Sequence, residues 1–381
     1  RGATGNDGDF NTMAEQLGFQ FRQIEAGSSI DRAVLTANDR REAVQALLMG
    51  LGKVARCGAR GVFLMEAGSE DQASFYEMRR DEEAMILDTL VVSQVGDEPQ
   101  GLPDEAFVAG TIEEVPASLR PRIEAGWSLP VMVLPLFAQG EPFGLVVVGS
   151  EPGEGVQEGD FRRAHRLADQ AAVGLNELRL RAELVETSWE ALRALANTID
   201  AKSKWTAGHS QRVTDLALLL GREVGLSEKE MDMLHRGGLL HDIGKIGVDG
   251  NILDFPGPLD AEARAAVQEH TRIGARILAP LTSFGPIMPI VLHHHERWDG
   301  KGYPDGLQGE SIHPLARLLA VADVFDAMVS ARPYREAIDP KIVRAHIVGD
   351  AGTAFDPAMV NAFEAVLDRG WTPLELETFH A

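Results

Sequence analysis

The stretch that decides the fold of the second half of this chain is His241-Asp242-Ile243-Gly244-Lys245. It follows a helical pattern that begins at Ser227 and Glu230, two residues with the spacing of a capping box. This pattern places His241 on the apolar face of the expected helix. A histidine on such a face is more often a core residue than a ligand, so its neighbours have to decide its role.

The composition is that of a globular chain with a strong negative charge. Its 381 residues suffice for two or three domains, 44% are hydrophobic, and the formal net charge is -22. We expect this charge to repel extended nucleic acid, whereas metals and a few basic residues would still allow a small anionic nucleotide to bind. The single cysteine, Cys57, excludes an internal disulfide framework, and we expect it to be a buried structural thiol rather than a cofactor attachment point.

The hydropathy pattern contains no run of about 18 apolar residues and no signal-peptide pattern. We therefore expect no membrane-spanning segment and a cytoplasmic location.

The first part of the chain, residues 1 to 185, mixes helical periodicity with strand-like runs. Residues 40 to 54 predict an amphipathic helix, residues 61 to 65 a strand, and residues 128 to 136 and 142 to 149 the two strands of a hairpin. These patterns predict an α+β domain that begins with a helical arm. The order of the elements resembles a GAF domain, a small-molecule sensor. The resemblance implies either a regulatory ligand pocket or a module that only dimerises or spaces.

A long helix is predicted to connect the two parts over residues 160 to 200, because this stretch has no proline and only one glycine. Its imperfect apolar stripe consists of Phe161, Ala164, Leu167, Ala168, Ala171, Leu175, Leu178, Leu184, Leu192 and Leu195. Such a stripe forms either a dimer seam or a surface that packs against the chain's own domains. We favour a signalling helix that makes a homodimer.

After residue 200 the pattern is helical and rich in histidine: of 11 histidines, only His165 comes earlier. Asp260 is expected to cap a helix on which Val267, His270 and Ile277 share one face. The metal-ligand candidates on inward faces are His209, His241, Asp242, His270, His294, His295, Asp323 and Asp326. Burying so many polar groups is costly without a metal or a dense hydrogen-bond network, so we expect a metal site.

Five motifs resemble the HD-GYP subfamily of the HD phosphohydrolase superfamily over about residues 190 to 375. They are Thr206-Ala207-Gly208-His209-Ser210, the stretch from His241 to Lys245, His294-His295-Glu296-Arg297-Trp298-Asp299-Gly300-Lys301-Gly302-Tyr303-Pro304, Ala322-Asp323-Val324-Phe325-Asp326-Ala327 and Arg332-Pro333-Tyr334-Arg335. The resemblance implies an all-α catalytic domain over residues 190 to 381 that hydrolyses cyclic di-GMP, a bacterial second messenger, to linear dinucleotide or GMP. Two alternatives stay open, a cyclic GMP-AMP phosphodiesterase and a catalytically idle binding module.

The resemblance also implies a ligand set. Seven side chains are carried over as metal ligands: His209, His241, Asp242, His270, His294, His295 and Asp323. Asp242 would bridge one metal, held with His209, His241 and Asp323, to a second. Nitrogen and oxygen ligands suit divalent iron or manganese, and also nickel or zinc. His293 lies outside the paired histidines, so we expect it to be structural.

The remaining candidate residues serve the substrate, and the resemblance implies Lys245, Arg332 and Arg335 among them. Asp242 and Lys245 are expected to be catalytic, and the expected substrate contacts are Lys245, Asp326, Arg332, Arg335, Gly302, Tyr303 and Trp205. Asp326 is also expected to orient a member of this network. The glycine-rich loop at residues 300 to 306 is either a substrate contact or a structural turn.

The number of metals is predicted from a departure in the first motif. Family members with three metals have Glu four residues before the first ligating histidine, where this chain has Trp205. An indole has no lone pair free to coordinate a metal, so we expect two metals. Trp205 would instead stack on a guanine or pack at the helix junction.

Overall fold

The computed structural model divides into two compact units, Arg1–Glu186 and Thr187–Ala381. Its described residues are 33–66, 72–79, 86–91, 102–203, 207–255, 257–331 and 336–370, with the backbone alone described at 87–91. Over these ranges, no helix combines the length and the apolar character needed to span a bilayer.

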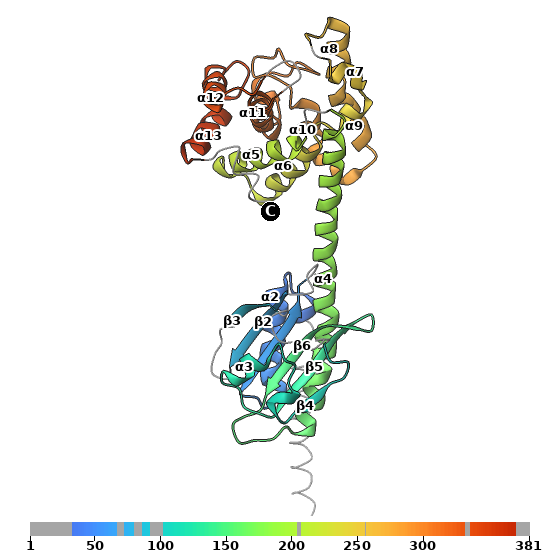
Figure 1. Ribbon diagram of the computed structural model, residues 1–381, viewed down its shortest axis with the longest axis vertical. Coiled ribbons are helices and arrows are strands. Elements are labelled where there is room, and N and C mark those ends of the chain that lie inside the picture. Colours follow the sequence, from blue (N-terminus) through green and yellow to red (C-terminus); the bar gives the residue numbers. More distant parts are fainter. Residues whose placement is uncertain are drawn as a thin grey trace, which may run out of the picture. The chain divides into compact units, whose positions relative to one another are not determined.

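The first unit is built on a six-stranded antiparallel sheet (Figure 1). The strands, in the spatial order β3-β2-β1-β6-β5-β4, are β1 Ala59–Met65, β2 Gln72–Arg79, β3 Ile86–Val91, β4 Phe107–Ala109, β5 Val131–Ala138 and β6 Glu141–Gly149. The β5–β6 hairpin turns at Gln139 and Gly140, whose φ angles of 53° and 90° match the twist of a tight hairpin. The strand and hairpin predicted from the sequence are confirmed.

Helices cover both faces of this sheet. Helix α2 (Arg40–Val54) and the first part of α4 (Glu158–Asp200) pack on one face, and the short α3 (Arg120–Glu124), which follows the 3-10 turn η2 (Ile112–Glu114), packs on the other. Because side chains alternate along a strand, Val62 enters the first core and Phe63 the second. Each fully buried side chain of this size contributes about 1.5–3 kcal/mol. The predicted α+β class is confirmed, and α2 has the predicted bounds.

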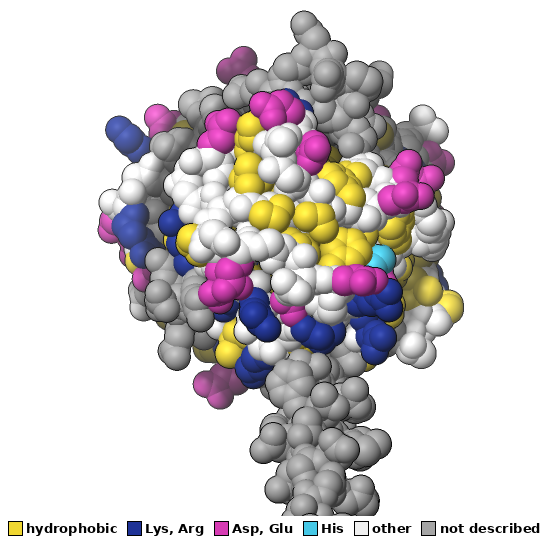
Figure 2. All heavy atoms as spheres, turned by 90° about the horizontal axis from the view of Figure 1, so that it is seen from below, with side chains coloured by type: hydrophobic (Ala, Val, Ile, Leu, Met, Phe, Trp, Pro, Cys, Tyr) yellow, Lys and Arg dark blue, Asp and Glu magenta, His cyan; other side chains and the backbone are white. Residues whose placement is uncertain are grey.

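Apolar side chains also gather on the surface. On the face drawn in Figure 2, hydrophobic side chains lie at the centre, and acidic and basic side chains lie around them.

Along α4, the predicted stripe divides into two kinds of residue. Ala164 and Leu175 belong to the core of the first unit and Leu192 to that of the second, whereas Leu184 is 70% exposed and Leu195 49% exposed.

The second unit is helical over its described elements. After the end of α4, these are α5 His209–Glu223, α6 Glu228–Leu240, η3 Ile243–Gly247, α7 Gly250–Leu253, α8 Ala261–Gln268, α9 His270–Leu278, η4 Thr282–Ile287, α10 Met288–His293, η5 Gly309–Ser311, α11 Pro314–Val329, α12 Pro340–Gly349 and α13 Pro357–Asp368. The capping box of Ser227 and Glu230 at the start of α6 is confirmed, as is the N-cap Asp260.

Helix α11 lies at the centre of this unit. Its residues from Leu318 to Asp323 are all buried, and it packs against α5, α10, α12 and α13. A helix that is apolar on nearly all sides is stable only inside a core. Asp323 therefore enters the interior on a rigid element that is surrounded by other helices.

The helix expected after Asp260 is assigned as two segments on either side of Glu269, whose φ of -61° and ψ of -15° remain helical. Helix α8 ends at Gln268 and has no buried residue, and α9 begins at His270. Of the face predicted from the sequence, His270 and Gly274 are buried, whereas Ile277 is 38% exposed and Leu278 is buried in its place, so the prediction is wrong for Ile277.

Gly244 sets how closely η3 approaches α9. A Cβ at this position would lie 1.7 Å from the carbonyl oxygen of His270 and 2.5 Å from the amide nitrogen of Gly274. Both neighbours are backbone atoms, so a side chain would force η3 and α9 apart. The glycine therefore brings the segment that carries Asp242 against the helix that carries His270.

We predict that Gly244→Ala lowers the free energy of unfolding of the second unit by about 1–3 kcal/mol, because overpacking shifts the backbone. Chemical denaturation followed by circular dichroism measures this change. Gly250→Ala is the matched control, since a Cβ there would meet no atom within 4 Å. Equal stabilities for the two variants would contradict the close approach.

Candidate metal centre

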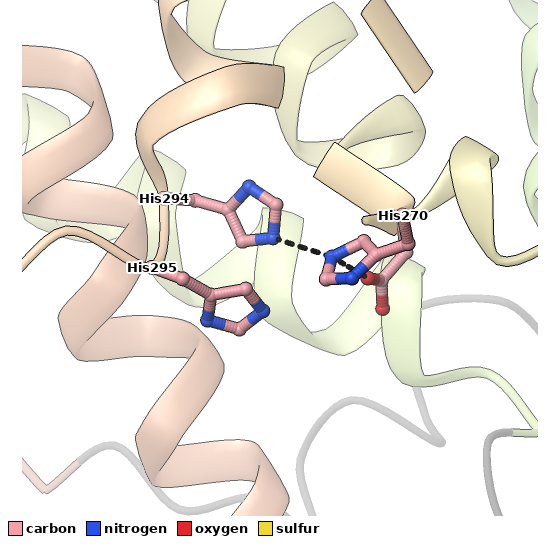
Figure 3. A group of neighbouring side chains, drawn as sticks. His270, His294 and His295 are labelled. Atoms are coloured by element: carbon pink, nitrogen blue, oxygen red, sulfur yellow. Dashed lines mark hydrogen bonds and ion pairs between the residues drawn. The ribbon is translucent and has the colours of Figure 1, made fainter. Parts of the chain in front are cut away.

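The seven side chains predicted as metal ligands converge inside the second unit from the ends of four helices and the middle of α11. Their ligand atoms form two groups, each with all atoms within 4.8 Å of one another. The His270 group consists of Asp242, His270, His294 and His295, and the His209 group consists of His209, His241 and Asp323. Figure 3 shows the imidazoles of His270, His294 and His295 gathered around one space.

The carboxylate of Asp242 lies between the two groups. Its Oδ1 is 3.3 Å from His270 Nε2, and its Oδ2 is 3.2 Å from His241 Nε2 and 3.7 Å from His209 Nε2. One oxygen therefore faces each group, which is the arrangement of a bridging carboxylate. The Lys245 ammonium also contacts Oδ2.

Backbone carbonyls fix the orientation of three imidazoles. The Nδ1–H of His241 donates to the carbonyl of Gly238 at 2.6 Å, that of His270 to Val267 at 2.7 Å, and that of His294 to Val291 at 3.1 Å. This tautomer leaves the Nε2 lone pair of each ring directed at the centre. A hydrogen bond on the far nitrogen is the usual way in which a protein aims a histidine at a metal.

A carboxylate performs this task for His209. The Nδ1 of His209 lies 2.7 Å from Asp326 Oδ2, and Arg212 donates to both oxygens of Asp326, at 2.7 and 3.0 Å. Nε2 of His209 is then left to face Asp323 Oδ1 at 3.2 Å. Asp326, expected to contact substrate and to orient a member of the site, thus has both oxygens engaged by His209 and Arg212.

Two of the central atoms fit a bound cation. His241 Nε2 and Asp242 Oδ1 are buried and make no hydrogen bond, and their residues are 0% and 2% exposed. A buried polar atom without a partner costs about 1–3 kcal/mol. A divalent metal in each group would accept these lone pairs. The imidazole nitrogens and carboxylate oxygens present therefore fit divalent iron, manganese, nickel or zinc.

The protonation states of the His270 group also favour metal binding. Burial lowers the pKa of His270, His294 and His295, so these imidazoles are neutral. Burial opposes ionisation of Asp242, but the positive charge of Lys245 holds the pKa of Asp242 well below its usual range. Neutral imidazoles and an ionised carboxylate are the states that coordinate a metal.

His209 differs from these residues. Burial acts to lower the pKa of His209, but its interactions with Asp323 and Asp326 outweigh burial and raise the pKa to about 9. Without a metal, His209 therefore carries a proton at neutral pH. A metal that binds the His209 group has to displace this proton.

The glycine-rich loop lies beside the His270 group. The ring of Tyr303 is 4.8 Å from the ring of His295, and a Cβ on Gly302 would lie 2.4 Å from the amide nitrogen of Arg297. Gly302 therefore permits a close backbone approach that places Tyr303 over a candidate ligand. His293 lies outside both groups, with its Nε2 3.1 Å from Asp305 Oδ2 on the same loop, which agrees with its predicted structural role.

Three predicted substrate contacts, Trp205, Arg332 and Arg335, lie outside the described residues. Arg212 was not among the site residues predicted from the sequence. Its signal was its position one helical turn after His209, but only the structure shows the carboxylate that it holds.

The adjacent side chains of His241 and Asp242 lie at the end of α6, inside a helical unit that supplies further histidines. This combination is the site of an HD-type hydrolase. The HD domain family matches residues 193–359. The cyclic di-GMP phosphodiesterase response regulator RpfG of Xanthomonas campestris is 33% identical over 290 residues, which cover 75% of this chain and 68% of RpfG. The chain therefore belongs to the HD domain family of metal-dependent hydrolases, as its motifs indicated.

Other similar proteins match separate parts of the chain. The 3'3'-cGAMP-specific phosphodiesterase 3 of Vibrio cholerae is 40% identical over 175 residues, 46% of this chain and 38% of that protein. The GAF domain structure of a phosphoenolpyruvate-protein phosphotransferase from Coxiella burnetii has 17% identity and a TM-score of 0.32, covering 42% of this chain and 96% of that one. The chain thus spans about two thirds of RpfG and well under half of the Vibrio protein.

We predict that metal affinity at the His209 group rises with pH up to about 9, because the metal competes with the proton on His209. The change is about tenfold per pH unit for one displaced proton. Calorimetric titration with Mn²⁺ at pH 7 and pH 8, in buffers of different ionisation enthalpy, measures both the affinity and the released proton. An affinity that falls as the pH rises over this range would contradict the assignment.

Proposed function

We propose that this chain hydrolyses the 3'-5' phosphodiester bonds of cyclic di-GMP to linear dinucleotide or GMP. One observation carries the proposal: a single buried carboxylate, Asp242, presents one oxygen to each of two ligand groups. Two adjacent cation sites suit a phosphodiester, whose charge builds on oxygens at both ends of the breaking bond. The names of relatives such as RpfG supply the cyclic dinucleotide.

Our proposal includes two divalent metals for each chain. We favour iron or manganese as their identity over nickel or zinc. Once bound, they would supply positive charge against the phosphate and an activated water. The ligand set is His209, His241, Asp242, His270, His294, His295 and Asp323. The choice of two metals rests on Trp205, which stands where a third ion would need a carboxylate.

The side chains of this protein would bind and orient the substrate. The Lys245 side chain is 20% exposed, and its ammonium, which contacts Asp242, can reach a phosphate oxygen beside the ligand groups. Tyr303 and Gly302 would form the wall beside His295. Trp205, Arg332 and Arg335 complete the proposed set on the strength of their motif positions alone.

A second candidate substrate is 3',3'-cyclic GMP-AMP. It is favoured by the Vibrio relative, which is 40% identical over 175 residues and is named as specific for cGAMP. A catalytically idle binding module is the third candidate. The complete ligand set opposes this candidate, because a module that only binds has no need for seven aligned ligands.

Turnover by the full-length, Mn²⁺- or Fe²⁺-loaded protein tests the proposal. We expect hydrolysis of cyclic di-GMP in preference to cyclic GMP-AMP, measured by chromatography of the products, and two metals per chain by elemental analysis. Asp242→Ala should lower turnover by about a hundredfold or more and reduce the metal content, because both groups lose their shared ligand.

Asp232→Ala is the matched control for this test. Asp232 is an exposed carboxylate on α6 that pairs with Arg236, so its loss should leave both quantities unchanged. A wild-type protein with two metals and no turnover of either substrate would favour the idle module. Normal turnover in Asp242→Ala would refute the metal assignment.

For the first unit, we propose regulation of the catalytic part by residues 1 to 185, a GAF-like module, through the connecting helix at residues 160 to 200. Residues 190 to 381 would form the catalytic domain. The first unit contains a cavity of about 490 Å³ beside α2 and α4, lined by apolar side chains such as Leu64 and Phe143 and by the Arg40–Glu66 ion pair. It offers a place for a small-molecule effector.

We also propose a homodimer through α4. Val173, Leu180 and Leu184 are exposed, and their spacings of seven and four residues match the a and d positions of a coiled coil. An isolated helix would leave this apolar seam in water. A second copy of the chain would cover it with the same residues.

We predict that Leu184→Glu weakens this dimer by at least about tenfold, because the burial of one leucine contributes about 1.5–3 kcal/mol and each copy loses one. Light scattering over a dilution series measures the mass. Ile342→Glu on α12 is the control, as Ile342 is 62% exposed and lies outside α4. A monomeric wild-type protein would exclude the dimer.

A further inference from the structure

Helix α5, which begins with the candidate ligand His209, lacks a cap from its own N-cap residue. The N-cap is Gly208, which has a φ of 67° and no side chain to accept a hydrogen bond. Helices without candidate ligands, such as α8, α12 and α13, are each capped by the aspartate that precedes them: Asp260, Asp339 and Asp356. The first amide groups of α5 therefore need an acceptor from elsewhere.

Asp200, the last residue of α4, supplies this acceptor. Its carboxylate is 3% exposed and accepts the backbone N–H of Ser210 at 3.0 Å and the Ser210 hydroxyl at 2.7 Å. Ser210 is fully buried and directly follows His209. Both oxygens of the carboxylate are used, so the contact fixes the orientation of the first turn of α5 as well as its position.

The same end of α4 reaches two other segments that carry site residues. Lys202 donates to the carbonyl of Ile246 at 2.5 Å, directly after Lys245. Trp189 stacks on His235 of α6, with ring centroids 4.1 Å apart, and α6 ends immediately before His241. The last turns of α4 and the residues after them therefore contact α5, α6 and η3.

These contacts favour one of the two ligand groups. His209 and His241 both belong to the His209 group, whereas His270, His294 and His295 come from α9 and α10. Asp200 lies within hydrogen-bond distance of the residue next to His209. The contacts of α4 with α5 and α6 thus lead to the His209 group, and its contact with η3 leads to Asp242, the ligand between the two groups.

We infer that Asp200 is a positioning residue that holds His209 in its ligating position, and that the end of α4 thereby controls metal binding at the His209 group. The inference deepens the proposed function and rests on it. It identifies the His209 group as the part of the site on which the connecting helix acts.

Metal binding by the full-length protein tests the inference without a turnover assay. We expect wild-type protein to bind two Mn²⁺ ions in a calorimetric titration. Asp200→Asn should bind one ion with unchanged affinity and the other with about ten- to a hundredfold lower affinity, the usual loss when a ligand's supporting contact is removed. Ser210→Ala, which keeps the backbone N–H but loses the hydroxyl, should give a smaller loss at the same site.

Asp356→Asn is the matched control. Asp356 is also a buried N-cap carboxylate, 5% exposed, but it caps α13, which carries no candidate ligand, and its ion pair with Arg317 lies at the start of α11, six residues before Asp323. Its replacement should lower the melting temperature and leave both Mn²⁺ affinities unchanged. Equal weakening of metal binding by Asp356→Asn and Asp200→Asn would reduce the effect to general stability and overturn the inference.

A double-mutant cycle separates the two ligand groups. If Asp200 acts through His209, Asp200→Asn should have no further effect on Mn²⁺ affinity in a His209→Ala background. An undiminished effect there would overturn the inference. A wild-type protein that binds no metal would refute the proposed function as well, whereas two normal sites in both Asp200→Asn and Ser210→Ala would refute the inference alone.

Discussion

The site depends on the carboxylate of Asp242, which is placed in the interior between imidazoles of two groups. Taking an ion out of water costs several kcal/mol, and only close opposite charge and good geometry repay this cost. Asp242 is 2% exposed, with Lys245, His241 and His270 around it. Its two oxygens face different groups, so the loss of this residue would leave both sets of histidines without a common anion.

The surrounding helices are arranged to satisfy this constraint. Gly244 lets η3 approach the backbone of α9, which brings Asp242 to His270. Gly238 allows α6 to pack against Thr214 of α5, where a Cβ would lie 2.6 Å from the threonine hydroxyl, and its own carbonyl accepts the Nδ1–H of His241. The same short segments thus provide the close packing and aim the ligands.

The imidazoles of the two groups differ in their protonation. Burial lowers the pKa of His270 and His294, which remain neutral, whereas neighbouring carboxylates outweigh burial in the other group: Asp323 and Asp326 raise the pKa of His209 to about 9, and Asp242 raises that of His241. The His270 group is therefore ready for a metal at neutral pH, and the His209 group has to lose a proton first. The group that needs this additional step is also the one that adjoins the end of α4.

The sequence by itself determined the elements and the list of candidate ligands, because apolar periodicity, caps and motif spacing are local properties. It predicted α2, the β5–β6 hairpin, α4 and the capping box of α6, and it identified the seven histidine and aspartate side chains that the structure brings together.

Only the tertiary structure decided how these residues are connected. Gly244 lets η3 approach the backbone of α9, and this contact places Asp242 beside His270. Asp326 contacts both His209 and Arg212 from more than a hundred residues along the chain, and Asp200 contacts Ser210, the residue next to His209, from ten residues away. Hydrogen bonds of this kind depend on distance and direction in space, and no local pattern of the sequence encodes either.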